Sequence, residues 1–243
     1  MNRSKRRRPL LVSFSGIDGA GKSTQIAAIH EGLREAGLRV RLITFWDDVA
    51  GLGRAREFLT HTLFQSEKGI GAPGKPVRRR DKDVRGWHMT VARFVLYFVD
   101  ALSLALVTAR ATAKGDAEVI VFDRYLYDEL ANLELDHRVS RTYARLLLTL
   151  IPRPDLAWVL DADPVQARQR KPEYEIDFLR SNRASYLALA SVAGGITVIP
   201  PMDADEITRR LLAEISRRLP RTSAPAIFSP VGEVEVVHKD GVR

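Results

Sequence analysis

A glycine-rich segment, GIDGAGKST (residues 16–24), constrains the fold of this chain more than any other feature. It follows a short apolar run, LLVSFS (residues 10–15), and precedes a helical pattern that ends at Gly37. The spacing GxxxxGK[ST] between a strand and a helix is the pattern of a phosphate-binding loop, whose glycines let the backbone wrap closely around an anion. The chain is therefore expected to bind a nucleoside triphosphate, and a plain glycine-rich turn is the alternative interpretation.

The polar residues of this loop suit a bound triphosphate. Lys22 supplies a positive charge to the β- and γ-phosphates, and the Ser23 hydroxyl suits Mg²⁺, which prefers oxygen ligands. The guanine-reading sequence NKxD is absent from the chain, so a kinase is favoured over a GTPase switch. The residues expected to hold the phosphates of ATP are Gly16, Gly19, Ala20, Gly21, Lys22, Ser23 and Thr24.

Apolar runs that alternate with helical patterns predict the rest of the fold. Strands that are apolar throughout and are separated by helices indicate a parallel sheet covered on both faces. The prediction is a three-layer α/β fold of the P-loop NTPase type, with a five-stranded parallel sheet. The expected strands are residues 10–15, 39–45, 119–122, 156–160 and 196–199. The expected helices are residues 22–36, 52–64 and 87–114, a pair ending at 150, residues 164–192 with a break near Pro172, and residues 203–219.

The formal charge of +8 is concentrated in two segments, residues 3–8 and residues 75–85. The rest of the chain is close to neutral, which argues against a nucleic-acid-binding domain with a basic face. The basic segment around residues 75–85 could clamp an anionic acceptor, steer nucleotides or simply be solvated. The predicted organisation is a disordered basic arm at 1–8, one catalytic domain at 9–219 with a mobile basic loop at 66–86, and an extended tail at 220–243.

The longest apolar stretch, residues 91–107, contains two charged residues, Arg93 and Asp100. Charges in the middle of such a stretch argue for a buried helix and against a membrane span. No apolar stretch of signal length follows the N-terminal arginines, and the chain has no cysteine for disulfides or thiolate metal sites. We therefore expect a cytoplasmic protein that does not span a membrane.

Several motifs together resemble the thymidylate kinase family over about residues 9–215. They are GIDGAGKSTQ with Asp18 in the loop, FDRY (residues 122–125), and PRPDLAWVLDADPVQARQR (residues 152–170). The resemblance implies that Asp18 reaches the sugar of the acceptor or the magnesium shell, although a polar turn residue is the alternative. An aspartate at the end of a strand, Asp123, can hold the hydration shell of Mg²⁺, and Arg124 can clamp a phosphoryl oxygen with two hydrogen bonds.

The third motif leads into the lid, a flap over ATP that is expected at about residues 164–180. Family members with glycine at position 19 supply from the lid the arginine that their loop lacks. Arg168, Arg170 and Lys171 are the candidates here, and such a charge would meet the transferring phosphoryl group. The resemblance also places Arg170 to stack on adenine, and a solvated basic helix face is the alternative.

The acceptor end departs from the family pattern. The family follows the second strand with an Arg-Glu-Pro-Gly run, but this chain has Trp46 and Asp48 in place of the arginine and the proline. Counted from Phe98, Leu102 stands where the family has a base-reading arginine. We therefore expect thymidylate to be a poorer acceptor than in the ordinary enzyme, or not to be the best one.

The long helix also carries the remaining acceptor candidates. Arg93, Tyr97 and Asp100 share one helix face, so they contact the acceptor or form a structural Arg–Asp pair. Tyr125 of the FDRY motif is a further acceptor candidate. Because this helix is apolar around most of its circumference, it must be covered on more than one side, and a homodimer through residues 88–114 would cover it.

The favoured function is ATP-dependent phosphoryl transfer to a nucleoside monophosphate, with thymidylate (dTMP to dTDP) as the default acceptor. ATP and Mg²⁺ are the expected cofactors, and nucleotides rather than nucleic acids or membranes are the expected partners. A kinase of the same fold acting on another phosphorylated or sugar-linked acceptor is one alternative, and a non-catalytic ATP-binding regulator is another. The expected catalytic residues are Lys22, Asp123, Arg124, Arg168 and Arg170.

Overall fold

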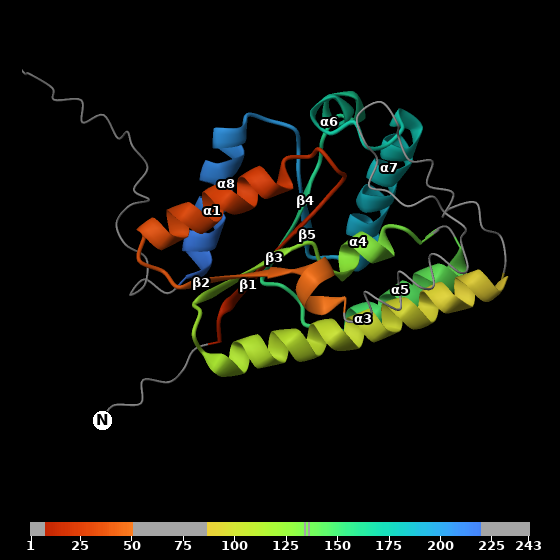
Figure 1. Ribbon diagram of the computed structural model, residues 1–243, viewed down its shortest axis with the longest axis horizontal. Helices are drawn as coiled ribbons and strands as arrows, with labels where there is room; N and C mark the ends of the chain where they lie inside the picture. The colour runs from red at the N-terminus through yellow and green to blue at the C-terminus, as the bar shows by residue number, and fades with distance from the viewer. Residues whose placement is uncertain (1–7, 51–86, 134, 136, 220–243) are drawn as a thin grey trace, which may run out of the picture.

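The computed structural model describes residues 8–50, 87–133, 135 and 137–219 (Figure 1). Four predicted features therefore lie outside the described residues. They are the N-terminal arm except for Arg8, the helix at 52–64, the basic loop at 66–86 and the tail at 220–243.

The core of the molecule is a five-stranded parallel sheet with the strand order β2-β3-β1-β4-β5. All five strands were predicted from the apolar runs, so the predicted sheet is confirmed. The strands are β1 (Leu10–Ser15), β2 (Val40–Thr44), β3 (Val119–Asp123), β4 (Leu156–Leu160) and β5 (Ile196–Ile199). The second strand is shorter than predicted because Phe45 begins a single π-helical turn, η1 (Phe45–Val49), which the Ala50 N–H closes on the Phe45 carbonyl at 2.9 Å.

Helices cover both faces of the sheet, as predicted. Figure 1 shows α1 and α8 side by side on one side, and α3 running with α5 along the other. The helix predicted at 164–192 is divided between α6 and α7, with Pro172 in the break. The helices are α1 (Lys22–Glu35), α3 (Trp87–Lys114), α4 (Leu126–Leu130), α5 (Arg138–Leu150), α6 (Pro164–Arg170), α7 (Ile176–Ala193) and α8 (Ala204–Arg218).

The central strands are apolar because both of their faces are covered. β1 lies between β3 and β4, and Val12 pairs with Val121 on one side and with Leu156 on the other. Parallel strands all end at one edge of the sheet, where ligands bind in open α/β folds. The residues that follow β1, β2, β3 and β4 therefore meet at that edge, and they include the phosphate-binding loop.

Helix α3 is buried on one side only, so the prediction of a buried helix holds for part of its surface. Tyr97, Ala101 and Leu104 are buried against the rest of the molecule. The opposite side exposes an apolar stripe made of Val91, Val95, Phe98, Leu102 and Leu106. Within the part of the chain that the structure describes, this is the one helix long and apolar enough to cross a membrane by length and composition, a test that core helices of soluble proteins also pass.

Candidate active site

The predicted phosphate-binding loop joins β1 to α1 at the carboxyl edge of the sheet. Gly21, the residue before the helix, has a left-handed backbone (φ 88°) that ordinary side chains disfavour. The first turn of α1 has neither a capping side chain nor an acidic residue. The N–H groups and the positive dipole end of the helix can therefore serve an anion held in the loop.

Two glycines of the loop are in close contact with neighbouring backbone. A Cβ atom on Gly16 would lie 2.5 Å from the Leu160 carbonyl oxygen at the end of β4. A Cβ atom on Gly19, whose φ is +83°, would lie 2.2 Å from the Ala167 carbonyl oxygen of α6. The loop is thus confined between the sheet and α6, and position 19 has no room for a side chain while α6 lies there.

The side chain of Lys22 is held inside the loop. Its Nζ atom donates hydrogen bonds to the carbonyl oxygens of Gly16, at 2.7 Å, and Ile17, at 2.9 Å. Burial and the nearby Arg124 guanidinium lower the pKa of Lys22 to about 8, although neighbouring carboxylates oppose that change. The ammonium group is therefore fixed next to the loop backbone, where a phosphate oxygen can replace a carbonyl as its partner.

Two motif residues that were predicted from different segments form one ion pair. Arg124 follows β3, and its Nη2 atom lies 2.5 Å from Asp18 Oδ1 in the loop. Burial raises the pKa of Asp18, but Arg124 and Lys22 outweigh it and bring that pKa below its ordinary value. Burial lowers the pKa of Arg124, but Asp128 and Asp18 outweigh it and raise that pKa. Both groups are therefore charged at neutral pH, and Arg124 stands beside the loop.

The predicted magnesium residues lie at the same edge of the sheet. Asp123 ends β3 and is partly exposed, while Ser23 is exposed in the first turn of α1. Burial raises the pKa of Asp123. The charges of Arg124 and Lys22 oppose that rise, and the charge of Asp47 in η1 adds to it. Asp47 was missed from the sequence, where its only signal is an acidic residue just after a strand that ends at this edge.

These carboxylates do not form a ready-made metal cage. No group of three or more histidines, aspartates and glutamates comes together among the residues that the structure describes. Mg²⁺ commonly keeps several waters and takes few ligands from the protein when phosphates supply the others. Ser23 and Asp123 therefore fit an Mg²⁺ ion that is held mainly by nucleotide phosphates and water.

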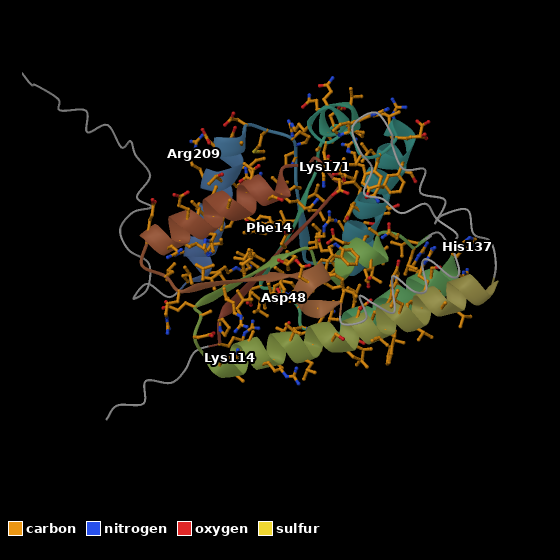
Figure 2. All side chains as sticks on the ribbon, in the orientation of Figure 1. Phe14, Asp48, Lys114, His137, Lys171 and Arg209 are labelled. Carbon is orange, nitrogen blue, oxygen red and sulfur yellow. The ribbon has the colours of Figure 1, made fainter. Side chains whose placement is uncertain are left out.

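The segment predicted to form the lid lies directly against the loop. Arg170 Nη1 is 3.4 Å from the carbonyl oxygen of Gly19, whereas Arg168 lines a shallow pocket with Val165, Gln169, Pro172 and Ile176. Lys171, labelled beside α6 in Figure 2, pairs with Glu173 at 3.3 Å. Of the three candidate cations, the structure therefore brings Arg170 into contact with the loop.

Helix α7, which follows this segment, is tied to the sheet. Asp161, just after β4, accepts two hydrogen bonds from Arg183 of α7, at 2.6 Å from Nε and 2.7 Å from Nη2. A bidentate arginine–carboxylate pair fixes orientation as well as distance. The position of α7 relative to β4 is therefore set by this pair.

The acceptor candidates on α3 are buried to different extents. Tyr97 is 7% exposed and Asp100 is fully buried, while Arg93 is partly exposed. Burial raises the pKa of Tyr143 on α5 to about 12, and the charges of Glu129 and then Asp100 add to this rise. Asp100 therefore lies close to Tyr143. A nucleotide could reach Asp100 only by displacing what covers it, so Tyr97 and Arg93 are the more accessible of the three.

Leu102, which was counted from Phe98 as the position of the family's base-reading arginine, lies on the outer side of α3. Leu102 is 49% exposed on the outer stripe together with Phe98, so neither residue faces the interior of the domain. The inward-facing aromatic is Tyr97, and the residue one turn later on its face is the fully buried Ala101. The exposure of Leu102 therefore argues against a base-reading position at residue 102, and the inward-facing position next to it, Ala101, carries no charge.

Three other candidates have mainly structural contacts. The Tyr125 side chain is fully buried, and its hydroxyl donates to the Pro152 carbonyl, which favours a role in the core. Trp46 is 44% exposed and packs edge-on against Phe45. Asp48, labelled in Figure 2 between the sheet and α3, accepts the N–H of Thr44 at 2.7 Å and so stabilises the turn after β2.

The chain has relatives among known proteins. No model of a known protein family matches it. It is 32% identical over 203 residues to the thymidylate kinase of Desulforudis audaxviator, covering 76% of this chain and 80% of the relative. It is 30% identical over 224 residues to the thymidylate kinase of Leifsonia xyli, covering 86% and 94%. The crystal structure of thymidylate kinase from Ehrlichia chaffeensis has the same fold, with a TM-score of 0.54 and 14% identity over 86% of this chain and 99% of that chain.

Proposed function

The chain belongs to the thymidylate kinase family, and we propose that it transfers the γ-phosphoryl group of ATP to dTMP. The family is one of nucleoside monophosphate kinases, with ATP as the phosphate donor. The two alternatives, a kinase for another acceptor and a non-catalytic regulator, gain no support from the relatives. Nucleotides, rather than nucleic acids or a membrane, are its proposed partners, and the cytoplasm is its proposed location.

One observation carries this proposal, which is the gathering of three cations around the phosphate-binding loop. Lys22 lies inside the loop, Arg124 is paired with Asp18 of the loop, and Arg170 reaches the Gly19 carbonyl from α6. Phosphoryl transfer depends on positioning and on neutralising the charge of the transferring group, and such an arrangement supplies both. A regulator that only bound ATP would have no need of Arg124 at the acceptor side of the loop.

In the proposed reaction, an oxygen of the dTMP phosphate attacks the γ-phosphorus of ATP. The bond from that phosphorus to the β–γ bridging oxygen breaks, and the products are dTDP and ADP. Lys22 holds the β- and γ-phosphates, and Arg124 clamps a phosphoryl oxygen. No covalent enzyme intermediate is needed, because the acceptor phosphate is itself the nucleophile.

We propose that Mg²⁺ binds with the triphosphate, near Ser23 and Asp123. When bound, the ion neutralises charge on the phosphates. Ser23 is exposed at the start of α1, and Asp123 ends β3, so both oxygens can face a ligand at the loop. Asp47, which acts electrostatically on Asp123, adds negative charge at the same place and favours a cation there.

We also propose that residues 164–180 act as the lid and that Arg170 is its catalytic cation. Arg170 already lies 3.4 Å from the Gly19 carbonyl, and the absence of a side chain on Gly19 allows α6 to approach the loop backbone. Arg168 and Lys171 lie on either side of Arg170 in the same segment and are proposed to support the binding of ATP. The lid then supplies the positive charge that the loop itself does not carry at position 19.

A homodimer through α3 is the proposed assembly. The exposed stripe of α3 is apolar over its whole length, and such a surface is costly to leave in water. Sedimentation of the wild-type protein at micromolar concentration is expected to give a dimer, and Leu102→Glu is expected to give a monomer. A wild-type protein that sediments only as a monomer would contradict this assembly.

The proposed activity is tested by measuring ADP release from Mg·ATP with dTMP and with a panel of other nucleoside monophosphates and phosphosugars. We expect dTMP-dependent ADP release and formation of dTDP. Release that depends on another acceptor but not on dTMP would contradict the proposed acceptor. A protein that binds ATP but releases no ADP with any acceptor would contradict the kinase itself.

A further inference from the structure

Asp128 of α4 is a buried carboxylate on which four hydrogen-bond donors converge. Its Oδ2 atom accepts from the Ser15 hydroxyl at 2.6 Å and from the Tyr125 N–H at 3.0 Å. Its Oδ1 atom accepts from the Tyr186 hydroxyl at 2.8 Å and from Arg124 Nη1 at 3.2 Å. Only 4% of Asp128 is exposed, and a buried carboxylate is costly unless its charge is compensated. Among these four donors, Arg124 is the one that carries a charge.

The backbone of Arg124 adds a second, independent observation. Its φ is +67°, which makes it the one non-glycine residue with a positive φ in the part of the chain that the structure describes. Such a conformation is unfavourable for a residue with a Cβ atom and persists only where the surroundings impose it. Here the Arg124 N–H is held by the Phe14 carbonyl of β1 at 3.0 Å. The backbone is thus held in an unfavourable conformation at Arg124, the residue proposed to clamp a phosphoryl oxygen.

The guanidinium group of Arg124 is consequently held on two sides. Nη2 is bound to Asp18 in the phosphate-binding loop, and Nη1 is bound to Asp128 beneath it. Each of these nitrogens carries two protons, so each can also donate to a phosphate oxygen. A guanidinium group fixed in this way loses little freedom when it clamps the transferring group.

We propose that Asp128 is a positioning residue that fixes Arg124 for phosphoryl transfer, and that Tyr186 couples this position to helix α7. The inference rests on the proposed kinase function. Tyr186 lies on α7, the helix whose first turn ends the proposed lid, and its hydroxyl is bound to the same carboxylate oxygen as Arg124. The chain of contacts from Tyr186 through Asp128 and Arg124 to Asp18 therefore joins the lid side of the molecule to the loop.

A purely structural role does not account for the charge of Asp128. The Tyr125 N–H and the Ser15 hydroxyl could equally be satisfied by the side-chain oxygen of an asparagine. Burial and the Asp128 charge raise the pKa of Tyr186 well above its ordinary value, so this phenol stays a neutral donor. Of the groups that donate hydrogen bonds to Asp128, only Arg124 carries a charge that a carboxylate compensates and an amide does not. The Asp128 charge also acts on the buried Lys22, whose pKa it raises against the effect of burial.

The test compares the wild type with Asp128→Asn, Arg124→Lys and the double variant in steady-state kinetics. For Asp128→Asn we expect kcat/KM for dTMP to fall by about tenfold to a hundredfold, as when a hydrogen bond to a charged group is lost. The dissociation constant for ATP is expected to change by less than about twofold. Because Asp128 acts through Arg124, the double variant is expected to be no worse than Arg124→Lys alone.

Glu214→Gln is the matched control. It also converts a carboxylate to an amide, but Glu214 lies on α8, where it accepts a hydrogen bond from Trp158 Nε1 at 2.9 Å. Its kcat/KM for dTMP is expected to equal that of the wild type. Losses that multiply in the double variant, or full activity of Asp128→Asn, would overturn the inference.

Two further measurements keep the inference separable from the proposed function and from folding. If the wild type does not turn over dTMP, the proposed function fails, and the inference is judged by the rate at which phenylglyoxal labels Arg124, followed by mass spectrometry. Asp128→Asn is expected to speed this labelling several-fold, and an unchanged rate would overturn the inference. If Asp128→Asn does not fold, Tyr186→Phe replaces it, with an expected fall in kcat/KM of about threefold to tenfold. An unchanged kcat/KM would again overturn the inference.

Discussion

The donor and acceptor sides of this molecule hold their key groups in different ways. On the donor side, Lys22 and the glycines lie on one continuous segment between β1 and α1, and backbone contacts fix them. On the proposed acceptor side, the candidate residues Tyr97 and Arg93 belong to α3, a helix that is exposed along its opposite face. A site built from backbone tolerates few changes, whereas a site built from helix side chains can change its ligand one residue at a time.

The two sides also differ in how much of the expected family pattern they keep. The loop retains every element of the pattern, while the acceptor side lacks the base-reading arginine and the Arg-Glu-Pro-Gly run. The donor chemistry is therefore expected to be that of the family, and the acceptor preference is where the chain can differ. Each of the following predictions addresses one side of this contrast, in order of decreasing effect.

Replacing Lys22 by alanine is expected to have the largest effect, on the donor side. The loss of a fixed charge from the site of phosphoryl transfer is expected to lower kcat by about a thousandfold. The measurement is ADP release with dTMP at saturating ATP, together with circular dichroism to show that the variant folds. Turnover of Lys22→Ala at the wild-type rate would show that the donor side does not work through this loop.

Gly19→Ala tests whether the donor side depends on backbone contact with α6. The new Cβ atom would lie 2.2 Å from the Ala167 carbonyl, so α6 must move away, and a displacement of this size is expected to lower kcat/KM by about a hundredfold. Gly37→Ala is the control, because its φ of +77° gives similar backbone strain but its Cβ atom would meet no other atom within 4 Å. Equal activities of the two variants would mean that strain, and not the contact with α6, decides the result.

Arg93→Ala tests the acceptor side. With Ala101 in the inward position one turn after Tyr97, Arg93 is the cation of α3 best placed to read a base, and its loss is expected to lower kcat/KM for dTMP by about tenfold. The wild type is also expected to separate dTMP from other nucleoside monophosphates less sharply than the ordinary enzyme does. Arg110→Ala, an exposed change near the other end of α3, is the control. Selective turnover of dTMP that survives Arg93→Ala would show that the acceptor side reads the base by other residues.

The smallest effect is expected from pH, and it belongs to the donor side. Burial, together with the nearby Arg124, lowers the pKa of Lys22 from its ordinary value of 10.5 to about 8, so the folded protein loses this positive charge as the pH rises through about 8. Because phosphates bind the charged form, the dissociation constant for ATP is expected to rise by about fourfold between about pH 7 and pH 8.5. Calorimetry in buffers of different ionisation enthalpy at about pH 8.5 is expected to show proton uptake on ATP binding, which Lys22→Ala abolishes.

For protein stability the sign is the opposite. Between about 8 and 10.5, Lys22 is neutral in the folded protein and charged in the unfolded chain, so the unfolded chain binds more protons. Lys22 is therefore expected to make the folded state more stable as the pH rises through that window. An affinity of the wild type for ATP that stays constant between about pH 7 and pH 8.5 would contradict a Lys22 pKa of about 8.

The contrast between the two sides also explains what could be predicted from the sequence. The loop, the strands and the position of Arg124 were predictable because local spacing determines them. Which side of α3 faces the interior was not predictable, because a difference of one residue rotates a helix position by about 100°. Counting from Phe98 gave Leu102, which is exposed, whereas its neighbour Ala101 is fully buried. Asp128 had a local signal that was not used, because it is the third residue of α4, where an acidic side chain caps the helix, and it lies four residues after Arg124. Asp47 carries no local motif, and the turn η1 after β2 brings it to the site.

The pair formed by Arg183 and Asp161 has a mechanical consequence. It holds α7 against β4, whereas α6 has no comparable ion pair to the sheet among the described residues. The part of the proposed lid that can move relative to this pair is α6 with the short segment before α7. The seven residues of α6 span only about 10 Å. If α6 acts as the proposed lid, a motion of this length carries Arg170 on and off the loop, and it must also separate the fully buried Ala167 from the Gly19 backbone.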